Sequence, residues 1–362
     1  MKKVHVIGCG QVGMSFSKLL LSKSYNVCVY EHPQTGLFQQ HPWGWMRRVT
    51  LQQKDRLKLP LERMNIDSKY MVRGPMIIST DSDNRKRIWD SWKNQTNTDS
   101  YFLSNEESVS KFKLTTKHNL VCDSRDFLFD FDSFHKDSVV TLKQRVEWND
   151  RSAVSKLIWS KNRLQYLELS DETLVPIAKD DKVLLSVGNQ TRRFFDLPFM
   201  GVSLAYTIIE PTMEKKEYIS MWSDSYSVQH FPTFTKIGCG MKGTIDFLPP
   251  IKYMVDFFPI FQRSNYNWME TNTEQLKKAC EQVGVPFSKE YKCTVDITPN
   301  FLPLVVPMGT NLVVVCGMSG SGFTTYEPWF LELIYKRMIY GSTGLDHRFQ
   351  FTNYSHVESY MY

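Results

Sequence analysis

Paired cysteines are missing from this sequence of 362 residues. Its seven cysteines are scattered and none forms a C-x-x-C pair, which argues against a zinc site of the usual kind. An odd number of separated cysteines indicates reduced thiols in a cytoplasmic protein rather than a disulfide framework. The seven are Cys9, Cys28, Cys122, Cys239, Cys280, Cys293 and Cys316.

No apolar run approaches the ~20 residues of a membrane-spanning helix. The apolar stretch near the start is interrupted at Gly8 and no small-residue cleavage site follows, so no secretory signal is predicted. The net charge of +6 is mild, and no basic stripe alternates with aromatic residues, which argues against a nucleic-acid partner. We therefore expect a cytoplasmic monomer or small homo-oligomer that binds neither nucleic acid nor membranes.

A β-turn-α-β pattern occupies the start of the chain. A strand, a helix and a second strand are expected at residues 3–8, 12–23 and 26–31. Gly8 permits a tight bend after the first strand, and Gly10 lets the backbone approach a pyrophosphate. Gly13 then allows the helix to pack closely on the strand.

Two further features of this unit favour a dinucleotide. Gln11 and Val12 lie at the start of the predicted helix, where free N–H groups and the positive end of the helix attract phosphate oxygens. Glu31 ends the second strand 18 residues after Gly13, where a carboxylate can accept hydrogen bonds from ribose hydroxyls. The pattern predicts a dinucleotide site without deciding between nicotinamide and flavin.

The remaining chain mixes β patterns with a few helices, and no repeat or low-complexity linker divides it. The expected helices are 85–95, 104–112, 272–284 and 327–340, and the expected strands are 70–79, 138–148, 182–187 and several between 199 and 247. Nucleotide-fold elements at both ends predict an α/β plus α+β fold class, in which a Rossmann-like domain is interleaved with a β-rich substrate domain. The predicted division is 1–50, 125–198 and 291–362 for the Rossmann-like domain, and 51–124 and 199–290 for the substrate domain.

A long segment near the C-terminus indicates which dinucleotide to expect. Residues 291–323, "YKCTVDITPNFLPLVVPMGTNLVVVCGMSGSGF", resemble the C-terminal FAD signature of the glycine/sarcosine oxidase branch of the D-amino-acid-oxidase superfamily. Thr298-Pro299-Asn300 is similar to the family's Thr-Pro-Asp turn. The stretch 317–323 is similar to its Gly-x-Ser-Gly-His-Gly-Phe loop, with Ser321 at the histidine position. Weaker resemblances follow in order at 43–48, 181–188 and 231–246. The resemblance implies an FAD-binding domain, because an NAD dehydrogenase leaves the C-terminal segment unexplained.

Within the superfamily, the chain is most similar to the monomeric sarcosine oxidase and pipecolate oxidase group. In that group a cysteine five residues before the Thr-Pro pair carries the flavin covalently, and Cys293 stands five residues before Thr298. The resemblance therefore implies covalent flavin at Cys293. His41 is the alternative, because related dehydrogenases attach flavin to a histidine in this region. The predicted FAD contacts are Gly8, Gly10, Gln11, Val12, Gly13, Glu31, Gly44, Arg47, Val146, Gly188, Cys293, Gly317, Ser319, Gly320, Gly322, Phe323 and Thr324.

The resemblance also implies a reaction. The family oxidises an amine or an amino or imino acid by passing a hydride from the carbon beside nitrogen to flavin, and oxygen then reoxidises the flavin to give peroxide. Lys242 matches a lysine that activates oxygen, since a fixed positive charge stabilises superoxide. Arg47 matches an arginine near the substrate face of the flavin, where a guanidinium can hold a carboxylate.

Three positions depart from the family pattern. Asp246 replaces a histidine, Val295 replaces an aromatic residue, and Thr324 replaces a lysine that helps to hold the substrate carboxylate. These changes exchange a cationic pocket for a neutral or anionic one, so we expect a small-molecule amine with a second cationic group. Asp246 joins Lys242 and Arg47 as a predicted catalytic residue. The aromatic residues available to line a wider pocket are Trp43, Trp45, Tyr326 and Trp329.

Two other functions remain open from the sequence. One is an FAD-dependent dehydrogenase, or an oxidative tailoring enzyme of a biosynthetic pathway, that does not use oxygen as its main acceptor. The other is a flavoprotein that has lost catalysis, since three pocket positions depart from the family pattern.

Overall fold

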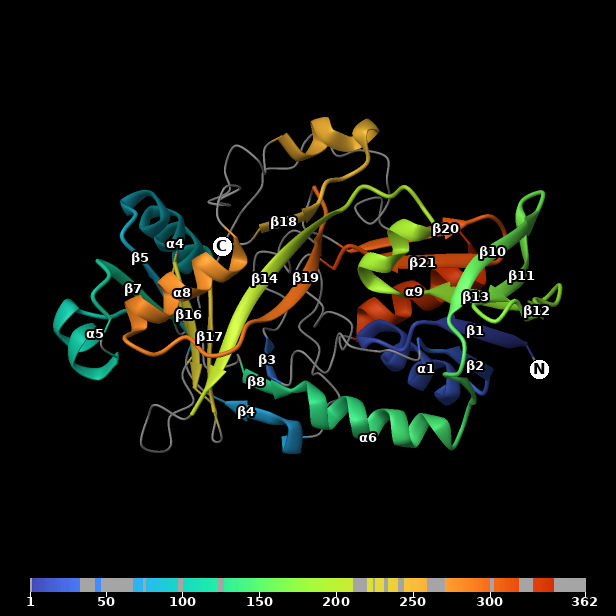
Figure 1. Cartoon of the computed structure of the whole chain (residues 1–362), viewed down its shortest axis with the longest axis horizontal. Helices are drawn as coiled ribbons and strands as arrows, with labels where there is room; N and C mark the ends of the chain where they lie inside the picture. The colour runs from blue at the N-terminus through green and yellow to red at the C-terminus, as the bar shows by residue number, and fades with distance from the viewer. Residues whose placement is uncertain are drawn as a thin grey trace.

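The computed structural model describes residues 2–32, 43–46, 68–73, 76–96, 100–112, 114–122, 127–210, 220–223, 225–230, 234–239, 244–258, 271–299, 303–318 and 328–341. These residues form two principal β-sheets side by side along the longest axis of the molecule (Figure 1). One sheet is built around the N-terminal strand. The other is built around the long strands β14 (Met200–Ile209) and β19 (Tyr291–Ile297).

The first sheet has six strands in the order β20-β21-β13-β1-β2-β9, all parallel except β20. The strands are β1 (Lys3–Ile7), β2 (Asn26–Tyr30), β9 (Glu147–Asn149), β13 (Lys182–Leu185), β20 (Leu304–Met308) and β21 (Leu312–Cys316). Val4 and Val6 of β1 are completely buried, as expected for a parallel sheet that is covered on both faces.

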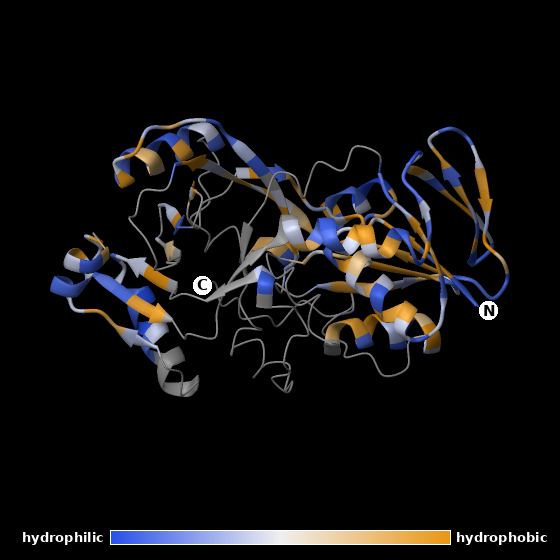
Figure 2. Ribbon diagram, turned by 90° about the horizontal axis from the view of Figure 1, so that it is seen from below, coloured by the Kyte–Doolittle hydropathy of each residue, from blue (hydrophilic) through white to orange (hydrophobic). Residues whose placement is uncertain are grey.

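Helices cover one face of this sheet and a three-stranded antiparallel unit covers the other. The helices are α1 (Gln11–Ser22), α6 (Phe131–Lys143) and α9 (Pro328–Tyr340), and the antiparallel strands are β10 (Val154–Ser160), β11 (Arg163–Leu169) and β12 (Leu174–Pro176). Phe16 and Phe330 are fully buried on the helix side, and Leu164 and Leu167 on the other. Figure 2 shows how strongly hydrophobic residues concentrate in these strands and helices.

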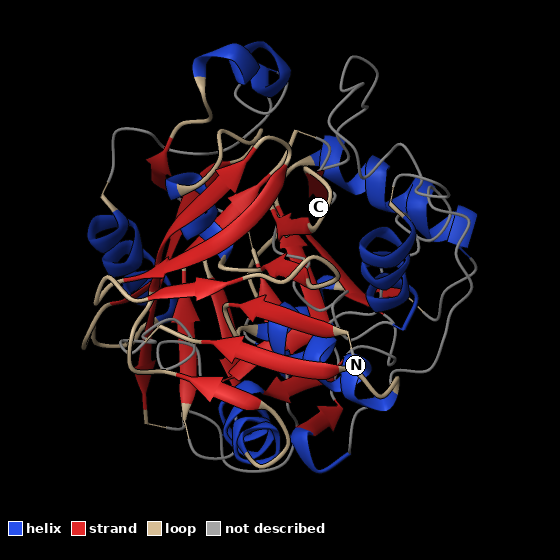
Figure 3. Cartoon of the chain, turned by 90° about the vertical axis from the view of Figure 1, so that its right-hand side faces the viewer, coloured by secondary structure: helices blue, strands red, loops and turns tan. Residues whose placement is uncertain are grey.

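The second sheet has nine strands, in the order β18-β14-β17-β16-β15-β5-β7-β6, with β19 also paired to β14. Besides β14 and β19, the strands are β5 (Met76–Thr80), β6 (Tyr101–Phe102), β7 (His118–Cys122), β15 (Ser220–Trp222), β16 (Ser227–His230), β17 (Thr235–Gly238) and β18 (Thr244–Phe247). Helix α8 (Asn272–Val283) packs on β14 and β17 through Leu276 and Ala279. Helices α4 (Asp83–Thr96) and α5 (Asn105–Phe112) lie beside β5 and β7. Figure 3 shows the strands at the centre of the molecule and the helices outside them.

Short elements complete the described chain. They are a small sheet of β3 (Trp43–Met46), β8 (Phe127–Asp130) and β4 (Met71–Arg73), and the 3-10 helices η1 (Ser68–Tyr70), η2 (Gly188–Arg193) and η3 (Ile251–Phe257).

The β-turn-α-β unit lies where the sequence predicts it, within one residue at each boundary of β1, α1 and β2. The predicted strand 70–79 is in fact two short strands, β4 and β5. The predicted domain boundaries stay a prediction. β19, which the predicted division places with the FAD-binding domain, is hydrogen-bonded to β14 of the other sheet from Tyr291 to Ile297.

The strands predicted near 138–148 are wrong. Residues 131–143 form α6, and only 147–149 form a strand, β9. Ser138 and Leu142 are four residues apart and both are buried, and the amine of Lys18 on α1 donates to the Ser138 hydroxyl at 2.6 Å. The β-branched residues in between favour a strand locally, but packing against α1 decides the structure.

Candidate functional site

Two glycines in the turn between β1 and α1 have no room for a side chain. Gly8 has a φ of +86°, and its N–H donates to the Tyr30 carbonyl of β2 at 2.8 Å. A Cβ at Gly8 would lie 2.7 Å from the Ser186 carbonyl oxygen, and a Cβ at Gly13 only 1.9 Å from the Gly8 carbonyl oxygen. Any other residue at either position has to push the helix away from the sheet.

The start of α1 is free of competing acidic groups. Gly10 is the N-cap residue, no side chain caps the helix, and its first turn contains no acidic residue. The backbone N–H groups that begin at Gln11 and Val12 therefore retain the positive character that binds phosphate oxygens.

Glu31 lies directly beside this turn. Its two carboxylate oxygens accept from the Cys9 N–H at 2.6 Å and the His32 N–H at 2.8 Å. Burial raises the pKa of the Glu31 carboxyl, and the two backbone N–H donors oppose this shift. Each oxygen has a second lone pair for a ribose hydroxyl, so the carboxylate, the glycine turn and the helix N-terminus together fit the adenosine diphosphate part of FAD.

Two more glycine turns lie at the same edge of the sheet, because β13 and β21 run parallel to β1. Gly188 follows β13 with a φ of +55°, and Gly317 follows β21 with a φ of +64°. A Cβ at Gly317 would lie 2.4 Å from Cγ2 of Thr298, so the start of the C-terminal loop lies against the Thr-Pro segment. Val146, another predicted contact, packs partly buried against the core on the helix side of the sheet.

Strand β19 carries Cys293, whose backbone pairs with Leu204 of β14. Beside it, the Thr294 hydroxyl donates to the carboxylate of Asp246 on β18 at 2.9 Å, and Asp246 is exposed. Val295 packs into an apolar cluster on the second sheet. The Asp246 carboxylate therefore lies next to the strand that holds the predicted attachment point.

Several predicted site residues lie outside the described part of the chain, and their roles stay predictions. They are His41, Arg47, Lys242, Ser319, Gly320, Ser321, Gly322, Phe323, Thr324 and Tyr326. The structure describes the backbone but not the side chains of Trp43, Trp45, Cys293 and Trp329. Gly44 pairs with Phe129 in the small sheet.

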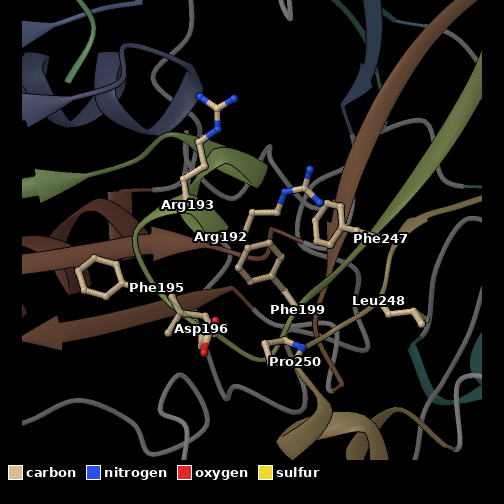
Figure 4. Close-up of a pocket in the computed structure, with 9 residues that line it drawn as sticks. Arg192, Arg193, Phe195, Asp196, Phe199, Phe247, Leu248 and Pro250 are labelled. Atoms are coloured by element: carbon tan, nitrogen blue, oxygen red, sulfur yellow. The ribbon is translucent and has the colours of Figure 1, made fainter. Parts of the chain in front are cut away.

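A cavity of about 410 Å³ lies between the end of η2 and the segment after β18. The Arg192 guanidinium carbon lies 4.2 Å from the centre of the Phe247 ring, a favourable cation–π arrangement. In Figure 4, Arg192 and Asp196 lie on opposite sides of the Phe199 ring. The sequence does not predict this cavity, because no motif links residues 192–199 to 247–250.

Asp296 is a second feature of the site that no sequence motif predicts. This carboxyl group is buried in β19, with 8% of its surface exposed. A charged residue within a strand pattern, two positions before Thr298, is the signal that could have identified it.

Within the described ranges, no group of three or more His, Cys, Asp or Glu side chains could hold a metal ion. No described helix is long and apolar enough to cross a membrane.

No protein-family model and no curated protein matches this sequence. Solved structures match its fold. Fructosyl amine:oxygen oxidoreductase (amadoriase I) from Aspergillus fumigatus has a TM-score of 0.74 at 15% identity, over 96% of this chain and 89% of that one. L-Proline dehydrogenase from P. horikoshii has a TM-score of 0.69 at 13% identity, over 96% of both chains. Glycine oxidase from Bacillus cereus has a TM-score of 0.68 at 13% identity, over 96% and 97%.

At these identities the likeness establishes the fold alone. The chain shares its fold with these solved oxidases and with the dehydrogenase. The predicted α/β plus α+β fold class, a Rossmann-like part together with a β-rich part, is confirmed.

Proposed function

We propose that this protein binds FAD and oxidises a C–N bond of an amine or of an amino or imino acid. FAD, when bound, would supply the hydride acceptor and the route of the electrons to oxygen, with peroxide as the product. The observation that carries the proposal is the set of glycine turns after β1, β13 and β21, together with Glu31, at one edge of the sheet. The fold shared with amine and amino-acid oxidases supports it.

The proposed roles divide between the two sheets. The β1–α1 turn and Glu31 bind the adenosine diphosphate part, and Cys293 attaches the flavin. Lys242 supplies the positive charge for oxygen reduction, and Arg47 and Asp246 face the substrate. Asp246 is supported by its place beside β19, where Thr294 holds its carboxylate.

The test is the visible spectrum of the purified protein before and after acid precipitation. Flavin colour in the pellet indicates covalent attachment, and Cys293→Ser should then move the colour to the supernatant. Colour in the supernatant of the native protein indicates FAD that is bound without a covalent link. A colourless native protein that remains colourless after incubation with FAD contradicts the proposal.

The second candidate is an FAD-dependent dehydrogenase or an oxidative tailoring enzyme. The likeness to an L-proline dehydrogenase, over 96% of both chains, favours it. Peroxide released in proportion to substrate consumed supports the oxidase. Turnover that needs an added electron acceptor supports the dehydrogenase. If no amine in a broad panel bleaches the flavin, a flavoprotein without this catalysis is the remaining reading.

A further inference from the structure

Asp296 is a buried acid at the junction of the two sheets. It lies on β19 between Cys293 and Thr298, and only 8% of its surface is exposed. Its carboxyl accepts a hydrogen bond from the backbone N–H of Gly317, the residue that opens the C-terminal loop. Its Oδ1 is buried and has no hydrogen-bond partner within the described part of the chain.

A buried oxygen without a hydrogen-bond partner destabilises the folded protein. A buried acceptor without a donor loses about 1–3 kcal/mol relative to water, and more when it is charged. No hydrogen-bond donor in the described structure meets Oδ1; the nearby Arg192 charge only partly stabilises the carboxylate, and the Gly317 N–H bond already holds the carboxyl in place. A binding partner that brings its own donor removes the penalty.

The charged and titratable groups around Asp296 come from three elements. Arg192 of η2 is the nearby cation, the fully buried thiol of Cys316 lies at the end of β21, and Asp246 lies on β18 beyond Thr294. Burial raises the pKa of Asp296 to about 7, while the Gly317 hydrogen bond and Arg192 oppose the rise. The carboxyl therefore changes charge near neutral pH.

We infer that Oδ1 of Asp296 accepts a hydrogen bond from an N–H or O–H group of the bound flavin dinucleotide. The inference rests on the proposed function, because it takes the ligand to be FAD. In this inference the Asp296 carboxyl has two roles at once. It accepts the hydrogen bond that fixes the Gly317 turn, and it contacts the FAD bound beside that turn. The ionised form accepts both hydrogen bonds most strongly, because protonation turns one carboxyl oxygen into a donor and removes the charge.

This role makes FAD binding depend on pH. A donor bound to the ionised carboxyl lowers its pKa in the complex, so binding expels the proton that Asp296 carries in acidic solution. With a pKa of about 7 before binding, the affinity falls as the pH drops through that value. The expected loss between about pH 8 and about pH 6 is about tenfold.

The test uses Cys293→Ser protein freed of flavin, so that binding is reversible. FAD is titrated at the two pH values, with the change in flavin fluorescence as readout. The dissociation constant should rise about tenfold at the lower pH. Adding Asp296→Asn should weaken binding at the higher pH and leave a ratio close to one. Asp180→Asn removes an exposed carboxylate before β13, at the opposite end of that strand from the Gly188 turn, and should keep the tenfold ratio.

A second measurement needs no change at Asp296, in case that variant fails to fold. Near pH 7, FAD binding to the Cys293→Ser protein should release about half a proton per flavin. A flat pH profile without proton release, or a tenfold ratio retained by Asp296→Asn, overturns the inference and leaves the proposed function intact. A folded protein that binds no FAD at either pH overturns both.

Discussion

Among the described glycines, Gly13 has the least room for a side chain. Its hypothetical Cβ lies 1.9 Å from the backbone oxygen of Gly8, and neither group can swing away without moving β1 or α1. Gly13→Ala should lower the free energy of unfolding by about 3 kcal/mol, measured by urea denaturation, and should reduce FAD binding. Gly284→Ala is the matched control. It has a φ of +75° but open space around it, so it should cost about 1 kcal/mol and leave FAD binding unchanged. Equal losses in the two variants would contradict the close packing at Gly13.

Glu31 makes a second prediction at this scale. The substitution Glu31→Gln keeps the length of the side chain but replaces one acceptor oxygen with a donor, so it cannot satisfy both the Cys9 and the His32 N–H groups. FAD should bind about tenfold more weakly, which corresponds to about 1.4 kcal/mol, the typical worth of one hydrogen bond to a charged group. Titration of the variant with FAD measures this. Unchanged affinity would place the ribose away from Glu31.

Site residues whose role depends on their spacing within one short segment can be predicted from the sequence. Site residues whose role depends on contacts between distant segments cannot. Gly8, Gly13 and Glu31 lie within one β-α-β unit, where spacing along the chain determines geometry. Arg192 stacks on the Phe247 ring and interacts electrostatically with Asp296 only because η2, β18 and β19 lie together in the fold. No spacing in the sequence encodes that convergence.

The stability of helix α8 depends on the hydrogen bonds at its N-terminus. Thr271 and Glu274 form a capping box: the Thr271 hydroxyl accepts from the Glu274 N–H at 3.2 Å, and the Glu274 carboxylate accepts from the Thr271 N–H at 2.8 Å. Thr271→Ala should destabilise the protein by about 1 kcal/mol, lowering Tm by about 2 °C. Thr271→Ser keeps the cap and should melt as the native protein does. A similar melting temperature for both variants would show that packing on β14 holds the helix without the cap.

Two helices, α5 and α6, show which secondary structure a sequence pattern predicts correctly and which it does not. The predicted helix 104–112 is confirmed as α5, and the capping box that Ser104 and Glu107 form at its start consists of local hydrogen bonds. For part of α6 the sequence wrongly predicts strands, because the buried face of this helix is defined only by its packing against α1. Local hydrogen bonding is encoded in short sequence windows, whereas burial of one face depends on a partner far along the chain.

At the scale of the whole molecule, the proposed site depends on how the two sheets meet. The nucleotide turns belong to the first sheet, while β19 with Cys293 pairs with β14 of the second. The sequence predicted that the domains interleave, since nucleotide-fold elements stand at both ends of the chain. It could not predict that β18 and β19 flank β14, because pairing between distant strands depends on side-chain contacts across the sheet.

This arrangement brings Asp246 beside β19 and gives the last prediction, on substrate charge. If the exposed Asp246 carboxylate faces the substrate, diamino acids should reduce the flavin faster than monoamino acids of equal length, because a solvent-exposed charge pair contributes about 1 kcal/mol. Asp246→Asn keeps an acceptor for the Thr294 hydroxyl but loses the charge. It should lower the ratio of the two kcat/KM values about fivefold in anaerobic flavin-bleaching assays. Asp180→Asn, which removes an exposed carboxylate before β13, should leave the ratio unchanged. Equal rates for both substrates in the native protein would show that Asp246 only stabilises the β18–β19 contact through Thr294.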